Sequence, residues 1–195
     1  MAIVEPLGRE NARAYFDALA RLRITVFREW PYLYDGDLAY ERDYLANYFA
    51  SPDAFIAGAF EGQQLVGACT ASPLEDHSDE FAIPFRMQGL NVSDYFYFGE
   101  SVLLPPYRGQ GLGVEFFNVR EAEARRQGYL RCVFCAVKRP DDHPMRPPDY
   151  TPLDAFWRKR GYAKMDGLEA EFAWKDLGDA TETPKPMQFW QKRLT

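Results

Sequence analysis

The chain has 195 residues, of which 47% are hydrophobic and 16% aromatic, so it can bury a real core and is too apolar to be disordered. Its formal net charge of −6 argues against nucleic acid as the main partner, because phosphate contacts need a basic face. Its longest uncharged apolar stretches, about ten residues, are too short to span a membrane, and the start lacks the cationic and apolar regions of a signal peptide, so we expect a cytoplasmic protein.

Apolar residues recur at helical or alternating spacing along the whole chain. The predicted elements are, in chain order, helices at 15–30 and 37–50, a hairpin of strands 54–60 and 64–71, an irregular stretch at 72–94, a strand at 95–104, a helix at 114–127, a strand at 131–137, a short helix that Thr151 caps and Gly161 ends, and strands at 169–175 and 187–192. Without repeats or a convincing boundary, this order predicts one mixed α/β layered domain over residues 1–195.

The segment Arg108-Gly109-Gln110-Gly111-Leu112-Gly113 stands between a strand and a helix, after a Pro105-Pro106 break. The first amides of a helix have no intrahelical partner, and the helix dipole is positive there. Glycines let a phosphate approach the backbone, and Arg108 adds a cation. The segment therefore predicts a site for a diphosphate.

The spacing of this segment excludes two common phosphate loops. The loop of nucleotide hydrolases needs a Gly-Lys-Ser/Thr triplet, and no Lys occurs between Arg108 and Lys138. The dinucleotide fingerprint needs a third glycine, where this chain has Val114 or Phe116. The pattern that remains is Arg-x-x-Gly-x-Gly.

This pattern resembles the acyl-CoA signature of the GNAT superfamily of N-acetyltransferases. A second match is Phe156-Trp157-Arg158-Lys159-Arg160-Gly161-Tyr162, and a third is the closing strand Phe189-Trp190-Gln191-Lys192, so the resemblance covers roughly Arg9 to Leu194. It implies a central mixed, mostly antiparallel sheet that is flanked by helices and splayed between its fourth and fifth strands. It also implies acetyl-CoA as co-substrate, with the pantetheine arm in the split.

The resemblance assigns the co-substrate contacts to two groups of residues. The backbone of Leu103 and Leu104 would bond the pantetheine. The pyrophosphate would lie on the loop residues Arg108, Gly109, Gln110, Gly111, Leu112, Gly113 and Val114.

The chemistry of such a site needs a proton acceptor, because an alkyl amine with a pKa near 10 arrives protonated. Glu100, a carboxylate in an otherwise apolar strand, is our candidate base, and the alternative is a Glu paired with an Arg for structure. An amide near Leu103 would serve the oxyanion. Family members often carry a Tyr as general acid where this chain has Trp157, so Tyr150, Tyr162 or solvent would protonate the thiolate.

Of the three cysteines, Cys132 and Cys135 form a Cys-x-x-Cys pair inside a predicted strand. Residues three apart on a strand face opposite sides, so we predict core residues and no metal site. A nucleophilic Cys needs a lowered pKa, which apolar surroundings do not give. We therefore expect direct attack by the amine.

The sequence indicates less about the amine acceptor than about the co-substrate. Five carboxylates of the 72–94 stretch suggest an acidic rim and a small cationic amine, although they would equally solvate a surface loop; they are Glu75, Asp76, Asp79, Glu80 and Asp94. Five N-terminal tyrosines either line the acceptor pocket or pack elsewhere; they are Tyr32, Tyr34, Tyr40, Tyr44 and Tyr48. The alternatives to an amine acetyltransferase are a non-catalytic acyl-CoA-binding sensor or interaction module and another nucleotide-linked transferase. The oligomeric state stays open between monomer and homodimer.

Overall fold

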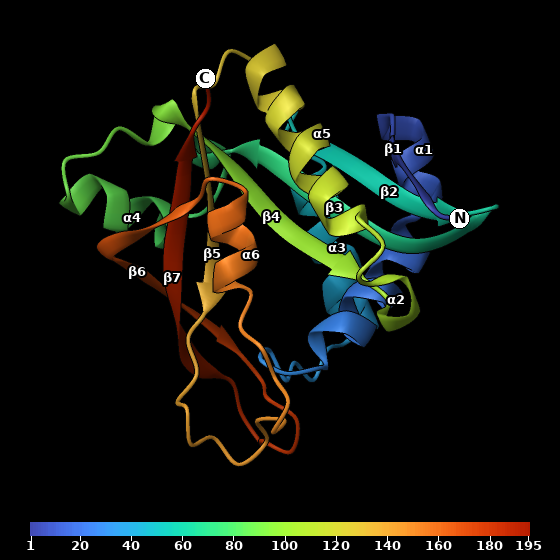
Figure 1. Cartoon of the computed structure of the whole chain (residues 1–195), viewed down its shortest axis with the longest axis vertical. Coiled ribbons are helices and arrows are strands. Elements are labelled where there is room, and N and C mark those ends of the chain that lie inside the picture. Colours follow the sequence, from blue (N-terminus) through green and yellow to red (C-terminus); the bar gives the residue numbers. More distant parts are fainter.

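The computed structural model describes the backbone of residues 1–195 and all side chains except those of residues 9, 10 and 47. Its helices and strands are β1 (Ile3–Pro6), α1 (Arg9–Ala14), α2 (Phe16–Phe27), α3 (Leu38–Tyr48), β2 (Phe55–Glu61), β3 (Gln64–Pro73), α4 (Asp79–Met87), β4 (Tyr95–Leu103), α5 (Leu112–Arg126), β5 (Arg131–Val137), α6 (Asp154–Lys159), β6 (Ala163–Trp174) and β7 (Thr183–Arg193) (Figure 1). Each described helix is too short or too polar to cross a bilayer.

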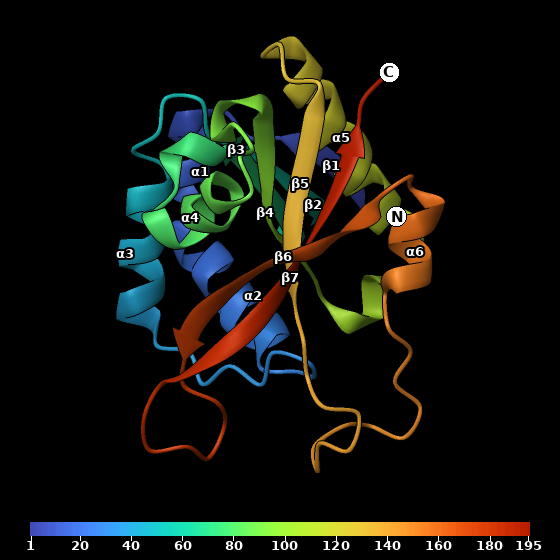
Figure 2. The same cartoon turned by 90° about the vertical axis from the view of Figure 1, so that its left-hand side faces the viewer.

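The strands form one seven-stranded sheet in the order β1-β2-β3-β4-β5-β7-β6. Only the β4–β5 pair is parallel, which confirms the mixed, mostly antiparallel sheet. Figure 2 shows this sheet between α1–α4 on one side and α5 and α6 on the other. The alternation of β4 builds both cores, because Phe96 and Phe98 pack toward α5 while Tyr95 and Tyr97 pack toward α4.

The sheet splits between β4 and β5, as the resemblance implied. The two strands pair only from Tyr95–Arg131 to Tyr97–Val133, and beyond these residues they diverge (Figure 1). The split begins next to a bulge, because β4 carries one residue more than β3 between the pairs Ser101–Cys69 and Phe98–Ala71. A bulge bends its strand and redirects the side chains that follow it.

Glycine is required at the bulge. A Cβ on Gly99 would lie 2.4 Å from the Thr70 hydroxyl oxygen. That oxygen accepts a hydrogen bond from the Glu100 amide at 3.2 Å. Without the bulge, Glu100 would share the face of Phe98 toward α5; with it, the side chain points toward α2 and α3. The bulge therefore places the Glu100 carboxylate on the face of the sheet that α2 and α3 cover.

Several predicted elements and boundaries were wrong. The 72–94 stretch contains α4, whose interior Pro84 argues against a helix but whose Ala82 and Phe85 are buried on one face. Thr151 does not cap a helix, since α6 begins at Asp154, which pairs with Lys164 of β6. The predicted helix at 15–30 corresponds to α2, which ends at Phe27, and neither the edge strand β1 nor α1 was predicted.

Candidate active site

A cleft of about 2400 Å³ passes through the split in the sheet. Residues of β4 and β5 form its middle, where the strands have separated. On the α5 side it is lined by the glycine loop and by α6, and we call this side the loop half. On the other side it is lined by α2, α3, α4 and β6 together with their loops, and we call this side the aromatic half.

The glycine loop forms the start of α5. Gly109 and Gly111 have positive φ angles of 75° and 89°, which other residues rarely adopt, and Gly111 is the N-cap of α5. A Cβ on either would meet nothing within 4 Å, so the space beside their backbone is open. Gly109, Gly111, Gly113 and Val114 all line the cleft. The loop thus presents a helix N-terminus to the cleft, an arrangement that suits an anion.

Of the three remaining loop residues predicted for the pyrophosphate, Arg108 lines the cleft, whereas Gln110 and Leu112 do not. The Leu112 side chain is buried in the core. The side-chain amide of Gln110 donates to the Pro106 carbonyl at 2.9 Å. Arg108 donates to the Leu103 carbonyl at 3.0 Å and to the Glu29 carboxylate at 2.8 Å. The cation of the loop is therefore paired across the cleft with the segment after α2.

Leu103 and Leu104, both predicted to bind the pantetheine, differ in the hydrogen bonds of their backbone groups. The Leu104 amide donates to the Val66 carbonyl, and its carbonyl accepts from the Tyr107 amide, both at 3.0 Å. Both backbone groups of Leu104 are therefore bonded within the protein. Successive residues of a strand direct their amides to opposite edges, and the Leu104 amide points to β3, so the Leu103 amide faces the edge that β5 has left. Of the two, Leu103 suits a bound ligand.

Glu100 lines the cleft at the split and is also paired with an arginine. It is 6% exposed, and Arg23 approaches its carboxylate at 2.7 Å. The Tyr44 hydroxyl lies 3.4 Å from the other carboxylate oxygen. Arg23 is also paired with the buried Glu41. Burial disfavours the guanidinium, but Glu100 and Glu41 together raise the pKa of Arg23. The cluster carries one positive and two negative charges. Glu100 therefore has both features considered for it, since it lines the cleft as a base would and is also paired with an arginine.

Arg23 and Glu41 were not predicted as site residues, and Tyr44 was predicted only as a possible lining residue of the acceptor pocket. The signal was present, since Glu41 and Tyr44 fall on the face of the predicted second helix that also carries Leu45. Arg23 likewise follows Leu22 on the buried face of α2. Charged residues on an apolar helix face are seldom buried unless they are paired. Their partners could not be named because they lie on three different elements.

The two predicted acid candidates lie in different surroundings. Tyr150 lines the cleft, where its ring packs edge-on against Trp30, and partial burial raises the pKa of its hydroxyl. Tyr162 is buried in the core and donates to Glu121 at 3.1 Å. Burial also raises the pKa of Tyr162. The contacts of Tyr162 are those of a structural residue, whereas Tyr150 has access to a ligand, as has Trp157.

The predicted acidic rim is reduced to one residue. Among the described side chains of the 72–94 stretch, Glu80 is the carboxylate that lines the cleft. Asp76 accepts a hydrogen bond from Ser51, and Asp79 accepts one from Arg86. Asp94 lines a different cavity. Four of the five predicted tyrosines do line the cleft, and these are Tyr32, Tyr34, Tyr40 and Tyr44.

The cysteine pair lies on opposite faces of the sheet, as predicted. Cys132 packs in the core under α5, and Cys135 packs on the other face beside Tyr97, whose hydroxyl is 3.1 Å from its sulfur. Burial raises the pKa of both thiols to about 12 and that of Cys69 to about 11. All three thiols are therefore neutral near pH 7 and poor nucleophiles.

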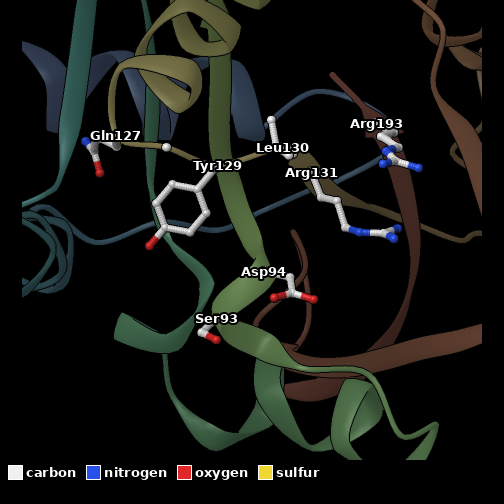
Figure 3. A pocket seen from close by; sticks show the side chains of 8 residues that line it. Ser93, Asp94, Gln127, Tyr129, Leu130, Arg131 and Arg193 are labelled. Atoms are coloured by element: carbon white, nitrogen blue, oxygen red, sulfur yellow. The ribbon is translucent and has the colours of Figure 1, made fainter. Parts of the chain in front are cut away.

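A second cavity of about 430 Å³ lies near the start of β5 and the end of β7. Figure 3 shows the guanidinium groups of Arg131 and Arg193 on the same side of it. Asp94 and Tyr129 also line it, and none of the residues predicted for catalysis or for acetyl-CoA binding does. The large cleft is therefore the candidate active site.

Comparison with known proteins agrees with this geometry. Residues 19–147 match the acetyltransferase (GNAT) family. The chain belongs to the acetyltransferase (GNAT) family. A search of curated proteins found no match. The fold is similar to that of three solved structures, each of low sequence identity, so the likeness shows the fold alone.

The first is a ribosomal-protein-alanine N-acetyltransferase from Brucella melitensis, at 14% identity over 98% of this chain and 99% of that one, with a TM-score of 0.63. The second is a PaiA N-acetyltransferase from Thermoplasma acidophilum in complex with coenzyme A, at 14% identity over 99% of each chain and a TM-score of 0.59. The third is a GNAT-family acetyltransferase from Staphylococcus aureus, at 10% identity over 100% of each chain and a TM-score of 0.62.

Proposed function

We propose that this protein transfers the acetyl group of acetyl-CoA to an amine by direct attack. The observation that carries the proposal is that one cleft runs from the glycine loop, through the split, to a pocket on the other face of the sheet. A CoA whose pyrophosphate lies on the loop would extend its thioester into the split. The coenzyme A complex of the Thermoplasma acidophilum neighbour supports the choice of ligand.

The residues at the split suit the steps of such a transfer. The amine loses a proton to Glu100, directly or through water, and its nitrogen attacks the thioester carbon. The Leu103 amide would donate to the oxygen on which negative charge develops. As the carbon–sulfur bond breaks, the nitrogen releases its second proton to solvent, and the CoA thiolate leaves and takes a proton from Tyr150, which solvent reprotonates, or from solvent directly. Glu100 then returns its proton to solvent. The raised pKa of Tyr150 keeps its hydroxyl protonated near neutral pH.

The cysteines support direct attack over an acetyl-cysteine intermediate. Thiols with pKa values of about 11 to 12 supply little thiolate at pH 7. Replacing Cys132 and Cys135 together with Ser should leave turnover intact within a few-fold, the loss of packing aside. Ping-pong kinetics together with an acetylated Cys in mass spectra would overturn this mechanism.

The alternative is a non-catalytic member of the family that binds acyl-CoA. Trp157 cannot supply a proton near neutral pH, and the Tyr162 hydroxyl is held by Glu121 in the core. The deciding experiment measures release of free CoA thiol from acetyl-CoA with a panel of primary amines. Amine-dependent release with formation of the amide supports the enzyme. Calorimetric binding of CoA without release on any amine would favour the sensor.

A further inference from the structure

Aromatic side chains from separate elements form one wall of the aromatic half of the cleft. Phe81 of α4 packs 4.4 Å from Phe172 of β6 and 5.1 Å from Tyr97 of β4, measured between ring centroids. Tyr32 lies 5.9 Å from Trp174. Apart from Tyr97, these rings are only partly buried, although they pack against a core cluster. Folding thus leaves a concave apolar wall uncovered, which is typical of a pocket for a small molecule.

Charge is distributed unevenly around this wall. At the split, the cluster of Arg23, Glu41 and Glu100 carries one net negative charge, and Glu80 adds another carboxylate to the lining. Among the described side chains, cations lie over Tyr44, Phe27 and Trp174, whereas none lies over Phe81 or Phe172. The pocket therefore has an apolar aromatic end and an end that favours a single positive charge.

The cations around the wall are already occupied. Lys185, over the Trp174 ring, donates to the carbonyls of Trp174 and Thr183 and to the Thr183 hydroxyl. Three further cations that line the cleft are paired with carboxylates, and they are Lys138, Arg146 and Lys175.

Arg139 donates two hydrogen bonds to Asp176, at 2.7 and 2.9 Å, and one each to the carbonyls of Pro31 and Tyr32. A guanidinium with five N–H groups has little left to offer a ligand after four such bonds. The pocket thus supplies poor recognition for a carboxylate or phosphate on the acceptor, because a buried anion needs a partner.

We propose that the acceptor is a small primary amine with an aromatic body and no anionic group, of the arylalkylamine class. Its ring packs on Phe81, Phe172 and Tyr97, and its amino group points to Glu100 at the split. This assignment rests on the proposed function, because the amino group must meet the thioester there. The assignment is more specific than the small cationic amine predicted from the sequence. The one charge of the acceptor is then its own ammonium group.

Equilibrium binding to the protein saturated with CoA tests the assignment without requiring turnover. The probes are 2-phenylethylamine, n-hexylamine, which has a similar amine but no ring, and phenylalanine, which adds a carboxylate. We expect 2-phenylethylamine to bind about three- to tenfold more tightly than n-hexylamine, since aromatic contacts add to area burial. Phenylalanine should bind at least about tenfold more weakly than 2-phenylethylamine, because its carboxylate loses water without gaining a partner.

Variants locate the preference on the wall. Phe81→Leu and Phe172→Leu keep an apolar side chain but remove a ring, so each should lower the preference for 2-phenylethylamine over n-hexylamine toward one. Tyr129→Leu removes a partly buried ring that lines the small cavity and should leave the preference unchanged. Equal binding of the two amines to the unmodified protein, tight binding of phenylalanine, or an unaltered preference in both Phe variants would overturn the assignment.

Thiol release with the same amines separates the two proposals. An aromatic preference in binding without release on any amine contradicts the proposed function and leaves the pocket assignment intact. Release that is equally efficient with ring-containing and ring-free amines supports the function and contradicts the aromatic assignment.

Discussion

The two halves of the cleft are built from different parts of the polypeptide. The loop half offers backbone from one continuous segment, with Gly109 and Gly111 in a conformation that other residues avoid. The aromatic half offers side chains from several elements that are distant in sequence, such as Phe81 and Phe172. A site made of backbone groups accepts few substitutions, and its residues are adjacent in the sequence. The specificity of a site made of side chains can change through substitutions that leave the fold intact. Variants that affect one half alone test this comparison.

The largest effect is expected between the halves, at Glu100. Glu100→Gln should lower kcat by about 10²–10⁴-fold, the usual cost of losing a general base, with a much smaller change in the Kd for CoA. Rates of the unmodified enzyme should rise with pH as the amine loses its proton. Steady-state kinetics across pH and calorimetry measure both quantities.

Glu41→Gln is the matched control for that experiment, because it disturbs the same Arg23 cluster away from the split. It should reduce stability more than kcat. If Glu100→Gln remained fully active with an unaltered pH profile, Glu100 would be a partner of Arg23 and nothing more.

A carboxylate in the glycine loop should damage the loop half selectively. Gly111→Glu places a negative charge beside the amides expected to hold the pyrophosphate, and CoA binding should weaken by well over tenfold, on the order of 1.4 kcal/mol or more. Gly178→Glu is the control for backbone strain, since Gly178 has a φ of 86°, open space around it and no place in the cleft. Unchanged calorimetric affinity of a folded Gly111→Glu variant would exclude the loop as the site.

Low pH should destabilise the protein next to the aromatic half, where His77 is partly buried. His77 packs 4.9 Å from Phe81 and 4.8 Å from Tyr97, and its Nε2 is 2.7 Å from the Ser72 hydroxyl. Burial lowers the pKa of His77 to about 4, although Asp76 and Glu100 oppose the shift. The unfolded chain therefore takes up the proton first, near pH 6.5.

The free energy of unfolding should consequently fall as pH drops from 6.5 toward 4, by about 1 kcal/mol per pH unit from this residue. Urea unfolding at several pH values measures the slope, and His77→Gln should flatten it. The Kd for CoA should change little over the same range in the folded protein. An identical slope in the variant would assign the acid sensitivity to other groups.

The smallest effect is expected where the halves meet, at the ion pair between Glu29 and Arg108. Both side chains are about two-fifths exposed, and such pairs contribute about 0–1 kcal/mol. Glu29→Gln frees the Arg108 cation and removes a negative charge near the loop, so CoA should bind up to about fivefold more tightly at low salt. Added salt should reduce the difference between variant and unmodified protein. Weaker binding of CoA by the variant would show that Glu29 supports the loop instead of competing for Arg108.

The parts that could be predicted from sequence are those that local rules determine. The glycine spacing and the helix after it specified the loop half, and alternation within 131–137 correctly placed Cys132 and Cys135 on opposite faces. The orientation of Glu100 could not be predicted, because it depends on a bulge that Gly99 and Thr70 create across two strands. The helix in the 72–94 stretch was missed because Pro84 obscured its apolar face.

The short pairing of β4 with β5 has a mechanical consequence. Three residue pairs join a four-stranded plate, β1 to β4, to a three-stranded plate of β5, β7 and β6. A ligand lying in the split touches both plates and bridges them where the backbone provides no hydrogen bonds. Binding of CoA in the split should therefore couple the two plates into one cooperative unit. We expect slower amide exchange at residues 95–97 and 131–133 and a higher Tm when CoA is present. The protein would then be most rigid while it holds its substrate.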